Sequence, residues 1–218
     1  MEKKPSRQER ERIALVQTVT QRAEELFREN GYENTTIDAL AASSEYTKRT
    51  IYRYFVSKED LYFAVMLKGH LQLLDVIHGG ASGGATGLDK ITMAYNALFE
   101  FFRDNGWFFD LTAQLKSIES KRDPGELPYY KEYAGCVDSL HKEIVGLFLT
   151  AHDDKSIRID VDPRQLGFSS TFILNGFFHM LRLYGDFFNR QLNMDKEQFI
   201  GFTIDLLFRS LQTPPAIS

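Results

Sequence analysis

The first helix that the hydrophobic pattern predicts lies between positions 10 and 27, where apolar residues recur at steps of three and four. This spacing places them on one face of an α-helix. They are Ile13, Val16, Val19, Ala23, Leu26 and Phe27. Gly31 then stands where a left-handed C-cap would end the helix, because glycine adopts a positive φ without steric cost. The pattern therefore predicts one amphipathic helix with a defined stop.

Two short helices are predicted to follow. Thr35 and Thr36 offer an N-cap for the first, and Thr47 offers one for the second. Between these caps, a short apolar stripe is followed by small residues. The stripe is Ile37, Leu40 and Ala41, and the small residues are Ala42, Ser43 and Ser44. Two short helices joined by a tight turn have the shape of a helix-turn-helix.

A long helix is predicted from Ser57-Lys58-Glu59-Asp60 towards Ile77. These residues form a capping box, in which the Ser57 hydroxyl and the Asp60 carboxylate satisfy backbone donors. The glycine-rich stretch GGASGGATG, Gly79 to Gly87, follows the helix. It lacks the Lys-Ser/Thr ending and the preceding strand of a phosphate-binding loop, so we interpret it as a flexible linker.

The remaining chain carries further helical patterns, at 88–104, 107–119, 126–152, 163–189 and 195–212. No alternating strand pattern is convincing, so the predicted fold class is all-α. The expected order is a helix-turn-helix domain with a basic arm at 1–58, a connecting helix at 59–78, the linker at 79–87, and a larger helical domain at 88–218.

Composition and charge narrow the class of protein. Hydrophobic residues make up 43% of the 218 residues, which is enough for a core. The chain has no apolar run long enough to span a membrane, and its start, MEKKPSRQERER, is charged, so a cytoplasmic protein is expected. The single Cys136 is interpreted as a core residue. The net charge is −4, yet residues 1–58 hold 11 Lys and Arg against 9 Asp and Glu, so the basic part is N-terminal.

The third predicted helix concentrates groups suited to DNA. A helix that starts at Thr47 carries its cations in the first turn and a half, where free N–H groups and the helix dipole favour phosphates. Its polar residues are Lys48, Arg49, Thr50, Tyr52 and Arg53. Ile51 and Phe55 would point back to the first two helices. The alternative is that the aromatic residues only pack a core and the charges form a solvated face, but the combination is what docking in a major groove needs.

Three stretches of sequence carry a resemblance to a known family. They are FRENGYENTTI (Phe27 to Ile37) followed by Leu40-Ala41, TKRTIYRYF (Thr47 to Phe55), and SKEDL (Ser57 to Leu61). Together they resemble the DNA-binding domain of the TetR family of transcriptional regulators, over about residues 10 to 65. The resemblance implies a homodimeric, ligand-responsive repressor that binds a palindromic operator. It also implies an N-terminal DNA-binding domain and a larger helical domain for ligand binding and dimerisation.

The resemblance assigns roles to single positions. In the family, the positions held here by Thr36, Thr47, Thr50, Tyr52, Tyr54 and Lys58 commonly touch phosphates, and those held by Lys48 and Arg49 lie nearest the bases. Two positions depart from the family pattern. Glu45 stands in the turn where glycine would accept a positive φ, so either the turn differs or strain is tolerated. Arg49 stands where the family often has glycine, which leaves the operator sequence open.

Aromatic residues gather in the C-terminal part, where they predict either a core or a pocket for a small apolar or aromatic effector. The candidate pocket residues are Tyr95, Phe99, Phe102, Trp107, Phe108, Phe172, Asn175, Phe178, His179 and Arg182. The polar ones among them share a helical face and would orient a ligand, although a buried histidine or a hydrogen bond across a dimer explains each equally well.

The last predicted helix is more apolar than a monomer needs. One stripe holds Phe199, Phe202 and Leu206, and the other holds Ile200, Ile204, Leu207 and Leu211. One face would pack inward and the other on a second copy, as in a four-helix bundle. The candidate dimer residues are Phe199, Phe202, Ile204, Leu207 and Leu211.

Other function classes find less support. The five histidines show no metal-binding spacing, and no nucleophile elbow, dinucleotide-binding glycine pattern or phosphate loop occurs, so we expect no enzyme, no cofactor and no metal. The alternative to a regulator is a helical module that binds a small molecule or partner and has lost sequence-specific DNA binding.

Overall fold

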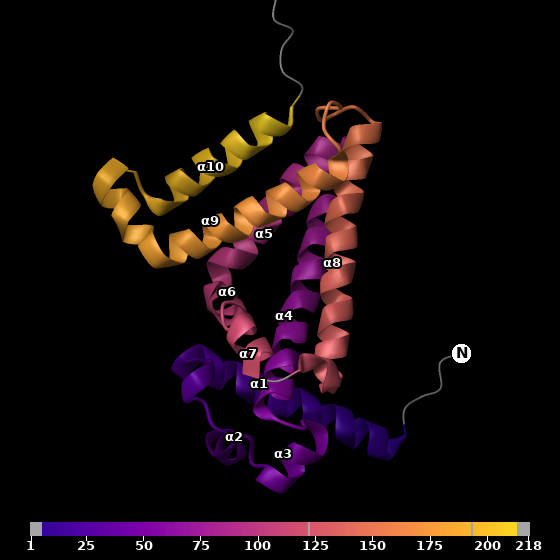
Figure 1. Cartoon of the computed structure of the whole chain (residues 1–218), viewed down its shortest axis with the longest axis vertical. Coiled ribbons are helices and arrows are strands. Elements are labelled where there is room, and N and C mark those ends of the chain that lie inside the picture. Colours follow the sequence, from indigo (N-terminus) through magenta and orange to yellow (C-terminus); the bar gives the residue numbers. More distant parts are fainter. Residues whose placement is uncertain (1–5, 122, 193, 213–218) are drawn as a thin grey trace, which may run out of the picture. The chain divides into compact units, whose positions relative to one another are not determined.

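The computed structural model describes residues 6–121, 123–192 and 194–212 (Figure 1). Within these ranges all regular structure is helical and no strand occurs, which confirms the predicted all-α fold. The helices are α1 (Arg7–Asn34), α2 (Ile37–Ser44), α3 (Lys48–Tyr54), α4 (Lys58–Ala81), α5 (Gly87–Asp104), α6 (Gly106–Thr112), α7 (Leu115–Lys121), the 3₁₀ turn η1 (Pro124–Glu126), α8 (Pro128–Asp153), α9 (Pro163–Leu192) and α10 (Lys196–Leu211). Among the described residues, none of the helices has the length and hydropathy needed to cross a membrane.

The chain folds as two compact units whose boundaries differ from the predicted domain order. The first unit contains the residues up to Leu71 together with Asp110–Cys136, and the second contains Gln72–Phe109 and the residues from Val137 onward. The sequence pattern gave no reason to assign the segment after Asp110 to the helix-turn-helix. It belongs there because its aromatic side chains pack on that part of the chain.

Aromatic contacts hold the first unit together. Tyr129 stacks on Phe55 at a centroid distance of 5.3 Å. Tyr130 meets the ring of Phe63 edge-on at 4.9 Å. The hydroxyl of Tyr62 donates to the Leu111 carbonyl oxygen at 2.9 Å. The start of α8 and the end of α6 are thus fixed against α3 and α4 by rings that bury large apolar areas and by a satisfied buried hydroxyl.

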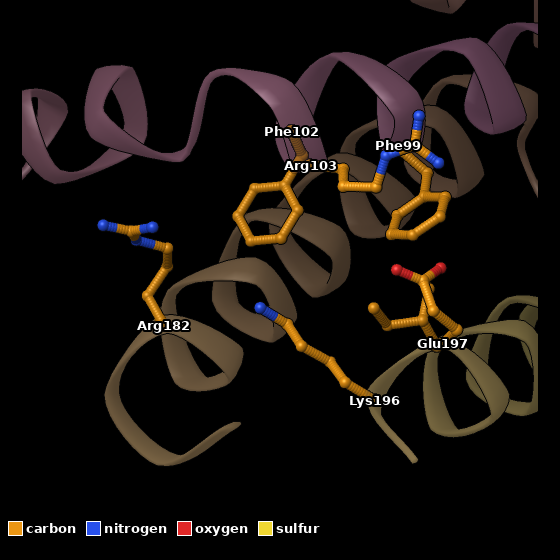
Figure 2. Close-up of a pocket in the computed structure, with 7 residues that line it drawn as sticks. Phe99, Phe102, Arg103, Arg182, Lys196 and Glu197 are labelled. Carbon is orange, nitrogen blue, oxygen red and sulfur yellow. The ribbon is translucent and has the colours of Figure 1, made fainter. Parts of the chain in front are cut away.

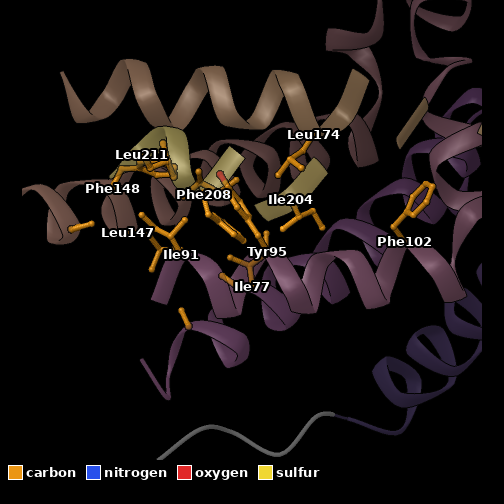
Figure 3. Packing of buried hydrophobic residues seen from close by; sticks show 14 of the residues in the cluster. Ile77, Ile91, Tyr95, Phe102, Leu147, Phe148, Leu174, Ile204, Phe208 and Leu211 are labelled. Carbon is orange, nitrogen blue, oxygen red and sulfur yellow. The ribbon is translucent and has the colours of Figure 1, made fainter. Parts of the chain in front are cut away.

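The second unit has a core of its own, built from α5, α8, α9, α10 and the second half of α4 (Figure 3). Its largest fully buried side chains are Tyr95, Phe102, Phe108, Phe148 and Phe178. The ring of Tyr95 stacks on Phe208 at 6.0 Å, and Phe102 stacks on Phe178 at 4.2 Å. Each helix turns one apolar stripe inward, as its 3.6-residue period predicts.

The glycine-rich stretch forms less of a linker than the sequence suggests. Helix α4 continues to Ala81 and α5 begins at Gly87, so only residues 82–86 connect them. Thr86 caps α5, and the main-chain N–H of Gly87 donates to Asp154 Oδ2 at 2.6 Å. A Cβ at Gly87 would collide with the backbone of Ala151. This glycine therefore serves a close helix approach, which composition alone does not distinguish from a flexible linker.

Candidate nucleic-acid interface and ligand pocket

The two caps predicted for the helix-turn-helix are present. The hydroxyl of Thr36 accepts from the N–H of Ala39 at 3.1 Å and begins α2. The hydroxyl of Thr47 accepts from the N–H of Thr50 at 3.1 Å and begins α3. Each cap satisfies one of the free donors at a helix start, so local sequence fixes where both helices begin.

The turn between α2 and α3 contains Glu45 in the left-handed region, with φ 61° and ψ 17°. The turn thus keeps the backbone that glycine would favour, and the glutamate carries the strain. A side chain in this conformation costs roughly 1 to 2 kcal/mol relative to a right-handed one. The two possibilities left open by the sequence are therefore resolved in favour of strain.

Helix α3 buries one side and exposes the other. Ile51 is fully buried, as is Phe55, so both point inward as predicted. Lys48, Arg49 and Tyr52 are exposed. The helix therefore presents two adjacent cations and a phenol to solvent. The ammonium of Lys48 forms an exposed ion pair with Asp38 of α2.

The other predicted DNA contacts divide by exposure. Thr36 and Thr47 are exposed at the starts of α2 and α3, whereas Thr50 and Tyr54 are half-buried. Lys58 is half-buried as well, and its ammonium has two local contacts. It donates to the Glu33 carbonyl oxygen at 3.2 Å and lies 4.2 Å from the ring centroid of Tyr32. Lys58 thus connects the end of α1 to the start of α4.

The candidate pocket residues of the second unit do not form one lining. Tyr95, Phe102, Phe108 and Phe178 are buried in the core, and Phe99 and Trp107 are half-buried. Burial raises the pKa of the Tyr95 phenol, which keeps it neutral. Phe172 is 77% exposed, and Asn175, His179 and Arg182 are exposed as well. The expected polar face of α9 therefore points mostly to solvent, and the amide of Asn175 donates to the Thr171 carbonyl oxygen at 3.0 Å.

A small cavity does form among α5, α9 and α10, with a volume of about 50 Å³ (Figure 2). Its lining residues are Phe99, Phe102, Arg103, Arg182, Lys196, Glu197 and Ile200. Three of these were candidates, namely Phe99, Phe102 and Arg182. The charged residues of α5 and α10 give no signal in the sequence for this cavity, because apolar periodicity does not reveal charges that meet at the ends of distant helices.

A wider and more open groove of about 250 Å³ adjoins the cavity between α5 and α10. The residues common to both hollows are Phe99, Glu197 and Ile200. The groove is also lined by Thr92, Asn96, Gly201, Ile204, Asp205 and Phe208. Its floor is therefore largely apolar, and its rim carries polar side chains. Among the described residues, no cluster of His, Cys, Asp and Glu is arranged to hold a metal ion.

Helix α10 divides its apolar residues differently from the predicted dimer stripe. Ile204 and Leu211 are buried in the core of their own unit, together with Ile200 and Phe208. Phe199 and Leu207 are half-buried, and Phe202 is 58% exposed. Two of the five predicted dimer residues thus have no surface to offer a second copy. The buried stripe of α10 consists of Ile200, Ile204, Phe208 and Leu211. The stripe predicted from the sequence contained Leu207 in place of Phe208.

Comparison with known proteins gives a match at the N-terminus. Residues 19–65 match the family described as bacterial regulatory proteins, tetR family. Uncharacterized HTH-type transcriptional regulators from Mycobacterium bovis and Mycobacterium tuberculosis are 42% identical over 48 residues, which is 22% of this chain and 24% of each relative. The chain is therefore matched over about a quarter of the length of these curated relatives.

Solved structures match over nearly the whole chain. A bacterial regulatory protein in the tetR family from Rhodococcus RHA1 has a TM-score of 0.68 at 17% identity, covering 92% of this chain and 98% of that one. The transcriptional regulator FadR from Bacillus subtilis, solved in complex with stearoyl-CoA, has a TM-score of 0.66 at 15% identity, covering 90% and 99%. At sequence identities this low, the TM-scores establish that the fold is shared and nothing more.

Proposed function

We propose that this chain, which has the helix-turn-helix domain and the all-α fold of the TetR family, is a ligand-responsive transcriptional repressor. In this proposal it binds a palindromic operator as a homodimer, and a small apolar or aromatic effector releases it. The alternative, a binding module that has lost DNA recognition, makes the opposite prediction in the test below.

The observation that carries the proposal is the geometry of α3. Its inner side is anchored by Ile51, which is fully buried, and its outer side offers Lys48, Arg49 and Tyr52. Long cationic side chains at the start of a short exposed helix reach base edges and phosphates in the major groove. The exposed hydroxyls of Thr36 and Thr47 supply further donors for phosphate oxygens.

A homodimer is supported by apolar residues that stay exposed on α9 and α10. They are Phe168, Phe172, Ile173, Met180 and Leu183 on α9, and Phe202 and Leu206 on α10. Seven exposed apolar side chains on two helices that contact each other are what a protein interface would cover. Two recognition helices would then sit about 34 Å apart to enter successive major grooves.

An effector is supported by the aromatic side chains and the hollows of the second unit. The Bacillus subtilis regulator, which shares the fold, was solved with stearoyl-CoA. Helices α4 and α8 each run from one compact unit into the other, at Leu71 to Gln72 and at Cys136 to Val137. An effector that shifts either helix would change the spacing of the two α3 helices, and the population would shift to a form that cannot bind both half-sites.

The test is selection of bound sequences from a random pool of double-stranded DNA. The wild-type chain is expected to enrich an inverted repeat, and Lys48→Ala/Tyr52→Ala is expected to lose the enrichment. Lys142→Ala is the matched control, because Lys142 is also an exposed lysine paired with an aspartate, in this case Asp138. Lys142→Ala should enrich the same repeat as the wild type.

Two results would contradict the proposal. Binding that does not depend on sequence, or that the double variant retains in full, would favour the module without DNA recognition. Specific binding should also weaken steeply as the salt concentration rises. The Lys and Arg side chains release counterions from the DNA phosphates on binding, and a higher salt concentration opposes this release.

A further inference from the structure

We propose that Lys196 and Arg182 bind the anionic head group of an amphipathic effector, and that the groove between α5 and α10 holds its apolar tail. This inference rests on the proposed function for the consequence of binding, and it refines the nature of the effector. The ligand class is an apolar chain that ends in a carboxylate or a phosphate.

The head-group site is the small cavity shown in Figure 2. In this view the side chains of Arg182 and Lys196 extend on the two sides of the Phe102 ring. The ammonium of Lys196 lies 6.0 Å from the centroid of that ring. Among the described residues, Lys196 has no carboxylate as an ion-pair partner. It therefore offers an exposed positive charge next to an apolar wall, within reach of a charge-assisted hydrogen bond to an anion.

Arg103 and Glu197 are two further charged residues that line the cavity. Arg103 forms ion pairs with Glu100 and with Asp104, the latter at 3.2 Å. The Glu197 carboxylate lies beside Phe99 in Figure 2 rather than at the Phe102 ring. The Phe102 side of the cavity therefore carries the ammonium of Lys196. The guanidinium of Arg182 also fills the space where a side chain at Gly106 would lie, so the glycine gives it room.

The cavity volume restricts what can enter it. A volume of about 50 Å³ suits a small head group such as a carboxylate or a phosphate. An effector that uses this site must therefore place the rest of its body elsewhere. The adjoining groove of about 250 Å³ is the available volume, and it shares Phe99 and Ile200 with the cavity.

The groove matches an apolar tail. Its floor consists of Phe99, Ile200, Ile204 and Phe208, and burial of a chain there would remove apolar area from water on both sides. Gly201 opens the wall of the groove, since a Cβ at this position meets no atom within 4 Å. The exposed Phe202 does not line the groove, so a partner copy on that side would leave it open.

The first test is calorimetric titration of the full chain with decanoate, decyl phosphate and decanol, below their micelle concentrations. Both anions should bind at least about tenfold more tightly than decanol. Lys196→Ala should weaken both anions by about tenfold and leave decanol unchanged, and Lys196→Arg should restore most of the affinity. Lys142→Ala is the control for loss of one exposed lysine charge. The two anions also separate the sources, because a carboxylate site and a phosphate site will rank them in opposite order.

The second test blocks the groove. Gly201→Leu should weaken decanoate at least tenfold, while Gly135→Leu should not. Gly135 is the matched control, since a Cβ there also meets no atom within 4 Å, and Gly135, on α8, is not one of the residues that line the groove. Equal decanoate affinity in both glycine variants, or equal affinity of decanol and the anions, would overturn the inference.

The outcomes distinguish this inference from the proposed function. The titrations contain no DNA, so a failure to select an operator would contradict the regulator and leave the anion site intact. Conversely, a selected operator together with no decanoate or decyl phosphate binding would contradict the site and leave the regulator intact. Trp107 is the single tryptophan and directly follows Gly106, so its fluorescence gives a second readout of occupancy.

Discussion

The carboxylate of Asp60 and the main-chain N–H of Tyr129 are joined by a hydrogen bond of 3.0 Å across 69 residues of the chain. The other oxygen of Asp60 accepts from the N–H of Val56 at 3.1 Å. The Asp60 side chain is fully buried. One carboxylate thus ties the loop that follows α3 to the start of α8, so the position of the helix-turn-helix depends on the C-terminal half of the sequence.

Replacing this carboxylate should destabilise the protein. Asp60→Ala leaves the partly buried N–H groups of Val56 and Tyr129 without this acceptor, which costs roughly 1 to 3 kcal/mol of unfolding free energy. Urea unfolding measures the loss. The control is Asp75→Ala on the same helix, where the side chain is exposed and the expected change is within about 0.5 kcal/mol. Similar losses in both variants would contradict this assignment.

Local signals in the sequence predicted the helix-turn-helix well. Thr36 and Thr47 cap α2 and α3, and Gly31 has a positive φ of 77°, because these features depend on residues within a few positions. The capping box at Ser57 was half right. The Ser57 hydroxyl accepts from the Asp60 N–H at 3.2 Å, but the Asp60 carboxylate bonds to Val56 and Tyr129. Which distant residue supplies a partner cannot be seen in a local pattern.

The candidate pocket was less predictable. Of the aromatic candidates, Phe99 and Phe102 line the small cavity, whereas Tyr95 and Phe178 fill the core. A single lysine at a helix start is common, so the sequence gives no reason to predict a role for Lys196. Lys196 lines the cavity only because α5 and α10 meet in the folded protein. The end of α5 at Asp104 and the start of α10 at Lys196 are 92 positions apart, and no sequence pattern predicts that they meet.

Gly87 should tolerate no side chain. Gly87→Ala places a methyl group against the Ala151 backbone and should lower the unfolding free energy by at least about 2 kcal/mol, since neither helix can move apart without opening the core. Gly79→Ala is the matched control. Gly79 lies within α4, and a Cβ there meets nothing within 4 Å, so alanine should be neutral or stabilise by up to about 1 kcal/mol. Thermal and urea unfolding of both variants would check the difference in sign.

Glu45→Gly should stabilise the turn of the helix-turn-helix. Glycine relieves roughly 1 to 2 kcal/mol of left-handed strain and gives back about 0.5 to 1 kcal/mol through its greater freedom in the unfolded chain. The expected gain is about 0.5 kcal/mol. In α2, Ala42→Gly should instead cost about 1 kcal/mol, because Ala42 is helical and exposed. A loss of stability in Glu45→Gly would show that the glutamate makes a compensating interaction.

The acid stability of the second unit should depend on Asp154. Hydrogen bonds from the Ser156 side chain and the Gly87 backbone hold the pKa of the Asp154 carboxyl below its ordinary value of 3.8. A carboxyl whose pKa is lowered by folding stabilises the folded state at any pH above its pKa in the unfolded chain. This stabilisation is lost as the pH falls through the pKa of the carboxyl in the folded protein. The melting temperatures of wild type and Asp154→Asn should therefore differ above pH 3.8 and converge below it. Asp75→Asn should follow the wild-type curve throughout, and a difference for Asp154→Asn that persists undiminished in acid would refute the assignment.

The proposed dimer should be sensitive to a charge on the exposed side of α10. Phe202 is 58% exposed, so a glutamate there will not disturb the core of its own unit, yet it would place an unpaired charge in an apolar interface. Phe202→Glu should lower the sedimentation mass towards that of one chain while the circular dichroism spectrum stays helical. Ile13→Glu is the control, because Ile13 is an exposed apolar residue on α1, outside the proposed interface. If Phe202→Glu keeps the wild-type mass, the dimer must use a surface other than this side of α10.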